Sequence, residues 1–118
     1  MTTQWVLINS AGGLSDYVQN ITSSQELSFN GALNTFIKAT AGSLGITLTI
    51  PTAIGFNGQI MKIMMIDTGI GGVSLVTDDT IEPQQTINGS FTYELTNQYQ
   101  TVSLESDGAN WFVTALAN

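Results

Sequence analysis

The stretch "LGITLTIP", residues 44 to 51, decides the fold class. Every second residue is apolar, and glycine or threonine stands between. Because side chains of a β-strand alternate between the two faces of a sheet, this period of two predicts a half-buried strand. Pro51 ends the strand, since proline has no N–H to donate to a neighbour. The apolar positions are Leu44, Ile46, Leu48 and Ile50.

The next strand predicted along the chain is "QIMKIMMID", residues 59 to 67, and it is apolar on both faces. Met61, Ile63 and Met65 share one face, and the other carries mostly isoleucine and methionine with one lysine. A strand of this kind is central in its sheet or pressed against a partner. We therefore expect Met61, Ile63 and Met65 to lie in the core or at an oligomer interface.

The remaining segments have the same period and are separated by turn residues. Asn88-Gly89 predicts a tight hairpin turn, and Asp107-Gly108 predicts the last one. In the final strand, alternation puts Trp111, Val113 and Ala115 on one face and Phe112, Thr114 and Leu116 on the other. No segment shows a helical stripe with caps.

These patterns predict one all-β domain over residues 1–118. We expect an antiparallel β-sandwich or barrel, jelly-roll-like, with a three-stranded meander over residues 84–116. Residues 1–22 are less regular and are expected to form an extended arm.

The charge composition excludes several functions. The chain has two lysines, no arginine, no histidine and no cysteine, and its net charge is −7. Because two lysines cannot neutralise many phosphates, we expect neither nucleic acid nor a membrane as partner. Histidine-dependent serine catalysis and thiolate chemistry are excluded. Charged residues are only 9% of the chain, which suggests that part of the surface is buried in an assembly.

Asp78, Asp79 and Glu82 form the densest acidic cluster. Their oxygens are the ligands that Ca²⁺ prefers, but the spacing is not that of an EF-hand. A solvated loop is the favoured interpretation, and the sequence leaves cation binding open. We expect no metal and no cofactor.

Asp67-Thr68-Gly69 follows an apolar strand and resembles the catalytic loop of retroviral-type aspartic proteases. Those enzymes pair two such aspartates across a dimer axis. This chain departs from the family pattern at Ile70, where alanine or serine is usual, and no basic residue follows Lys62. The protease is a remote alternative, and we expect no enzyme; an ordinary strand-to-turn tripeptide is the favoured interpretation.

The last two-thirds of the chain resembles β-domains of tailed-phage virion proteins. The resemblance rests on "ITLTIP", "GFNGQIMKIMMIDTG", "SLVT" and "YQTVSLESDGANWFV", which closes with an "SDG-x-N-W" hairpin. It implies a non-enzymatic structural protein, and the short chain favours a capsid-decorating (cement) protein. Such a protein would be made in the host cytoplasm, trimerise, and clamp neighbouring major capsid subunits on the capsid surface. The resemblance also implies an N-terminal arm that contacts the capsid, at Gln4, Trp5 and Val6.

The alternative is a tail-fibre or head-fibre domain that recognises glycans on the host surface. Such sites use stacking rings and amide donors. The candidate ligand surface would be Tyr93, Tyr99, Asn110 and Trp111. The competing interpretation, which we favour, is that aromatic residues on strands pack in the core.

Overall fold

The computed structural model describes residues 16–117, and this part of the chain is all-β with no helix. Its strands are short and joined by turns or loops of irregular backbone. The bounds are β1 Asp16–Ile21, β2 Gln25–Glu26, β3 Asn34–Ala39, β4 Ile46–Ile50, β5 Ile60–Met65, β6 Val73–Thr77, β7 Thr92–Leu95, β8 Thr101–Ser106 and β9 Trp111–Ala117.

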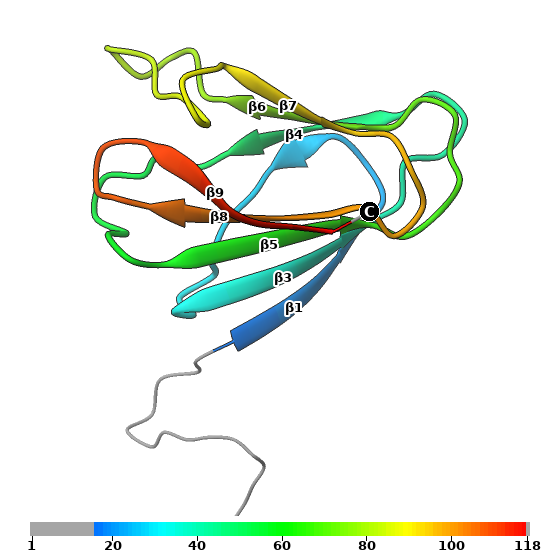
Figure 1. Cartoon of the computed structure of the whole chain (residues 1–118), viewed down its shortest axis with the longest axis horizontal. Coiled ribbons are helices and arrows are strands. Elements are labelled where there is room, and N and C mark those ends of the chain that lie inside the picture. Colours follow the sequence, from blue (N-terminus) through cyan, green and yellow to red (C-terminus); the bar gives the residue numbers. More distant parts are fainter. Residues whose placement is uncertain (1–15, 118) are drawn as a thin grey trace, which may run out of the picture.

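The strands form two sheets, drawn one above the other in Figure 1. The five-stranded sheet has the order β1-β3-β5-β8-β9, and the four-stranded sheet has the order β2-β4-β6-β7. From β1 to β6 the chain passes from one sheet to the other at every step. Each odd-numbered strand and the following even-numbered one therefore make one coil, and successive coils stack.

This winding corrects the predicted antiparallel topology, because both sheets are mixed. β1·β3, β3·β5, β2·β4 and β4·β6 are parallel, whereas only the last pairs of each sheet are antiparallel. Parallel neighbours need a long crossover. Here each crossover contains a strand of the other sheet with a short loop on either side. In the sequence this arrangement looks the same as successive hairpins. The two separate sheets also exclude a closed barrel.

The predicted three-stranded meander over residues 84–116 is also wrong, because its strands belong to two different sheets. β7 pairs with β6 in the four-stranded sheet, whereas β8 pairs with β5 and β9 in the five-stranded sheet. Only β8 and β9 form a hairpin. The turn predicted at Asn88-Gly89 is present, with positive φ at both residues, but it is flanked only by an isolated bridge between Ile87 and Ser90.

The N-terminal arm predicted over residues 1–22 is partly replaced by a strand. Asp16–Ile21 forms β1, which lies beside β3 in parallel register and is the outermost strand of its sheet. Residues 1–15 lie outside the described part of the chain.

Neighbouring coils are joined tightly at one end, where loop 40–45 contacts loop 66–72. The Asp67 carboxylate accepts hydrogen bonds from the backbone N–H of Ala41 (2.9 Å) and of Gly42 (3.0 Å). A Cβ on Gly69 would lie 2.3 Å from the Gly42 carbonyl oxygen, so only glycine fits this approach. Gly71 approaches the backbone of Leu44 and Gly45 in the same way, so packing between the two loops requires glycine at both positions.

The core lies between the sheets and draws on both. Trp111 is fully buried, stacks on Phe29 at 6.2 Å, and donates from its indole N–H to the Pro51 carbonyl at 3.0 Å. Phe29 in turn stacks on Phe56 at 5.2 Å. Because Trp111 begins β9 and Pro51 follows β4, this hydrogen bond links the two sheets.

Candidate functional site

The outer face of the five-stranded sheet, which points away from the core, is the candidate functional site. The strand register places Val18, Phe36 and Lys62 in one row across β1, β3 and β5. Neighbouring rows add further apolar side chains. The apolar members of this face are Val18, Phe36, Ile60, Met64, Phe112 and Ala115.

These apolar side chains are accessible to solvent. Val18 is 54% exposed and Phe112 is 42% exposed, and Phe36 is half-buried. Between β1, β3 and β5 the face is hollowed by a groove of about 380 Å³, lined by Val18, Asn34, Thr35, Phe36, Ile60 and Lys62. Large contiguous apolar patches on a protein surface mark interaction sites, so this face is the one to test for a contact.

Both lysines of the chain lie on this face. Lys38 and Lys62 are opposed there by Glu105 on β8, while the whole chain carries −7. The Lys62 ammonium group lies 5.6 Å from the centre of the Phe36 ring, a cation–π contact. The candidate surface is therefore mainly apolar and carries both lysines of an acidic protein.

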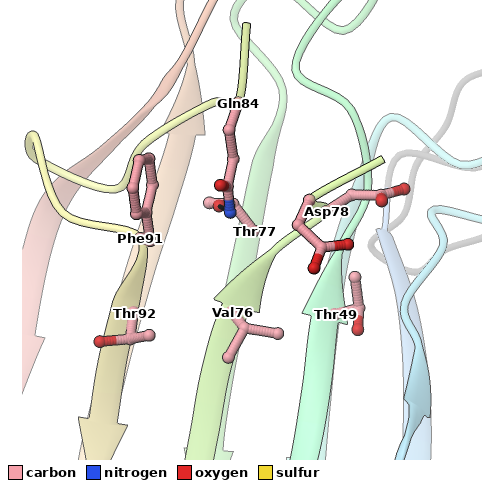
Figure 2. A pocket seen from close by; sticks show the side chains of 8 residues that line it. Thr49, Val76, Thr77, Asp78, Gln84, Phe91 and Thr92 are labelled. Carbon is pink, nitrogen blue, oxygen red and sulfur yellow. Dashed lines mark hydrogen bonds between the residues drawn. The ribbon is translucent and has the colours of Figure 1, made fainter. Parts of the chain in front are cut away.

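The outer face of the four-stranded sheet is polar. Its side chains are mainly threonine and serine, and the Ser74 hydroxyl donates to the Glu94 carboxylate at 2.7 Å. Figure 2 shows Thr49, Val76 and Thr92 in one row across β4, β6 and β7. Polar side chains on the outside are what a solvated sheet face requires.

A second hollow of about 380 Å³ opens where β6 ends (Figure 2). Asp78, Asp79 and Gln84 line it beside Phe91, which is 51% exposed. The Asp78 carboxylate is already engaged, since it accepts hydrogen bonds from the Thr80 hydroxyl and N–H, and these lower its pKa. Within residues 16–117 no group of three or more Asp, Glu, His or Cys side chains is placed to hold a metal ion.

Met61, Ile63 and Met65 are fully buried in the core. They point from β5 toward the four-stranded sheet, and the opposite side of the same strand carries the accessible Ile60 and Met64. A contact with a second subunit through this strand would therefore use Ile60 and Met64.

The four residues of the alternative ligand surface do not form one exposed patch. Trp111 is fully buried, and the Asn110 side-chain oxygen accepts the Thr86 N–H at 2.9 Å. Tyr93 packs against the core, whereas Tyr99 is 58% exposed on the β7–β8 loop. The indole and the amide thus serve the fold.

The Asp67 carboxylate is committed to the fold as well. Hydrogen bonds from the backbone of Gly42 and then Ala41 hold its pKa below the ordinary value near 3.8. The carboxylate thus joins loops 40–45 and 66–72 by hydrogen bonds, and we call this contact the brace between the coils.

Gln4, Trp5 and Val6, the predicted capsid-contact arm, lie outside the described residues. Between residues 16 and 117, no helix is both long and apolar enough to cross a bilayer.

The sequence prediction missed most of the outer face, because its members lie on four strands. A β-bulge between Ser103 and Leu104 adds to the difficulty, since the extra residue, Thr114, reverses the alternation in β9. Phe112 and Ala115 consequently share a face, although simple alternation separates them. The only signal in the sequence was the apolar second face of residues 60–66.

No protein-family model, curated protein or solved structure matches this chain.

Proposed function

We propose that this chain is a non-enzymatic structural protein of a tailed-phage virion. In this proposal it is a β-sandwich that trimerises on the capsid surface and clamps neighbouring major capsid subunits. The observation that supports it is the outer face of the five-stranded sheet, which is accessible and mainly apolar and also carries both lysines. Its strands thus have two apolar faces, one for the core and one for a partner.

The chemistry of this face specifies the capsid surface it would fit. Phe36 and Val18 need an apolar counterpart, and Lys38 and Lys62 need carboxylates. Burial of apolar area is favourable by about 25 cal/mol per Å², although net affinity is smaller because association costs entropy. A capsid subunit with a flat apolar patch bordered by aspartate or glutamate would satisfy both requirements.

Purified virions from the source test the location. Mass spectrometry should detect the chain in them, and immunogold labelling should decorate the capsid shell. Label at the tail tip would favour the glycan-binding alternative, in which the protein binds host cells and not decoration-free capsids. Absence of the chain from virions would refute the proposal.

Two variants test the surface. Phe36→Glu places a charge in the middle of the proposed contact, and Thr47→Glu places the same charge on the outer face of the other sheet. Binding to decoration-free capsids should be lost in the first and kept in the second. Equal binding by both would exclude the outer face of the five-stranded sheet as the capsid contact.

A further inference from the structure

Within residues 16–117, the five-stranded sheet ends in two open edges, β1 and β9, and both are longer than the edge strands of the four-stranded sheet. Open edges offer unpaired N–H and C=O groups to other chains, so proteins usually shorten them or place charges on them. β2 has two residues and carries Glu26, and β7 has four residues and carries Glu94. Both edges of the four-stranded sheet are thus protected.

β9 is longer and has no charged residue. Its first part is covered, because the Trp111 N–H donates to the Thr86 carbonyl at 2.9 Å and the Val113 N–H donates to the Asn88 side chain at 2.9 Å. Beyond Val113, nothing within residues 16–117 pairs with this edge. The uncovered part is Thr114, Ala115, Leu116 and Ala117, all exposed, and Leu116 is 63% exposed.

β1 is the opposite edge of the same sheet. The Ile21 carbonyl accepts the Thr40 N–H and therefore points toward β3. Since backbone groups of successive residues alternate in direction, those of Val18 and Asn20 point outward. In the described part of the chain no strand covers them. Both side chains are exposed, and Asn20 makes no hydrogen bond there.

We propose that the β1 edge of one copy pairs with the uncovered part of β9 in a second copy. A contact between different edges is head-to-tail, and a head-to-tail contact that closes into a ring leaves no open edge. The five-stranded sheet would then continue from subunit to subunit. This inference rests on the proposed function only for the number of copies, which is three.

Static light scattering on the full chain tests the pairing. The wild type should have three times the 12.6 kDa mass of one chain. Asn20→Pro removes the outward N–H of β1, which an edge strand tolerates, and should reduce the mass to one chain. Asn20→Ala loses the same side chain but keeps the N–H, and should retain the wild-type mass.

Leu116→Lys tests the other edge by adding a charge to β9, and should also reduce the mass to one chain. Ile54→Lys is its control, because Ile54 is 61% exposed and lies on the β4–β5 loop, in neither β1 nor β9. Circular dichroism should give the same β spectrum for all four variants. If a variant does not fold, hydrogen exchange of the wild type takes its place. The amides of Val18 and Asn20, and those amides of residues 114–117 that point away from β8, should exchange faster on dilution.

Several outcomes overturn the proposal. One is a wild type that is monomeric at high micromolar concentration. Another is hydrogen exchange at both edges that does not change with protein concentration. A third is a dimer that Leu116→Lys dissociates and Asn20→Pro does not. The last result would mean that β9 pairs with another β9. A closed ring of a different size, dissociated by both variants, supports the pairing and contradicts only the trimer. Location in the virion is independent of all these masses.

Discussion

The outer faces of the two sheets have opposite compositions. The outer face of the four-stranded sheet carries threonine, serine and Glu94, while that of the five-stranded sheet carries valine, phenylalanine, isoleucine and methionine with two lysines. Both sheets bury an apolar inner face in the same core. Folding alone requires one apolar face per sheet, so folding does not account for the second apolar face of the five-stranded sheet, whereas the proposed capsid contact would.

The largest effect on folding is expected from Met65→Asp, compared with Met64→Asp on the same strand. Met65 is fully buried, so its replacement puts an unpaired charge in the core and should unfold the protein, a loss of at least about 4 kcal/mol. Met64 faces outward and should tolerate the charge with a loss below about 1 kcal/mol. Urea unfolding followed by tryptophan fluorescence measures both. Similar losses would show that the two sides of β5 do not differ as described.

Trp111→Phe is expected to have the next largest effect. It removes the indole N–H that reaches the Pro51 carbonyl and leaves a small void beside Phe29. We expect a loss of about 2 kcal/mol in the free energy of unfolding. Phe112→Leu, at the exposed neighbouring position, should cost less than about 0.5 kcal/mol. A loss in the Phe112 variant as large as in the Trp111 variant would contradict the assignment of their faces. Urea unfolding followed by circular dichroism gives both values.

Asp67→Asn should have a smaller effect, because the amide can accept only one of the two loop N–H groups. We expect a loss of about 1 kcal/mol at neutral pH, since the site is partly exposed. The folded-state pKa lies below the unfolded value near 3.8, so this stability is present above that value and is lost as pH falls through the folded-state pKa. The stability of the variant should therefore fall less steeply than that of the wild type as the pH is lowered below about 4.

Asp79→Asn is the matched control for this prediction. It removes the same charge from an exposed position in the β6–β7 loop and should change the unfolding free energy at pH 7 by less than about 0.5 kcal/mol. Thermal unfolding of both variants across the pH range makes the comparison. An unchanged pH profile in Asp67→Asn would show that the brace between the coils does not contribute to stability.

Phe36→Glu should have the smallest effect on folding and, at the same time, abolish capsid binding. The side chain faces outward, so the unfolding free energy should fall by no more than about 1 kcal/mol. Loss of folding with loss of binding would assign Phe36 to the structure of the domain. Thr47→Glu, on the polar face, should change neither property.

The strands were largely predictable from the sequence, whereas their partners were not. A period of two is local, so "LGITLTIP" and "QIMKIMMID" revealed β4 and β5 directly. The choice between parallel and antiparallel pairing depends on which sheet the next strand joins, and this is decided by packing between residues far apart in the chain. The short polar loops were therefore mistaken for hairpin connections.

The candidate site was predictable only where one strand showed it. Residues 60–66 revealed an apolar second face, but the contributions of Val18, Phe36 and Phe112 depend on the sheet order and on the bulge in β9. The roles of Asp67 and Asn110 were also hidden, because each is defined by backbone N–H groups more than 20 positions away.

The winding of the chain has a consequence for how such a protein could change its size. Asp16 lies beside Asn34 and Thr35 lies beside Met61, so coils of 18 and 26 residues stack in register. The extra residues of the longer coil lie partly in its loops and partly in β4, which has five residues where β2 has two. Duplication or deletion of one coil would therefore change the length of the molecule along the direction in which the coils stack, and would leave the β5–β8–β9 end intact. Such changes would alter that length by one coil at a time.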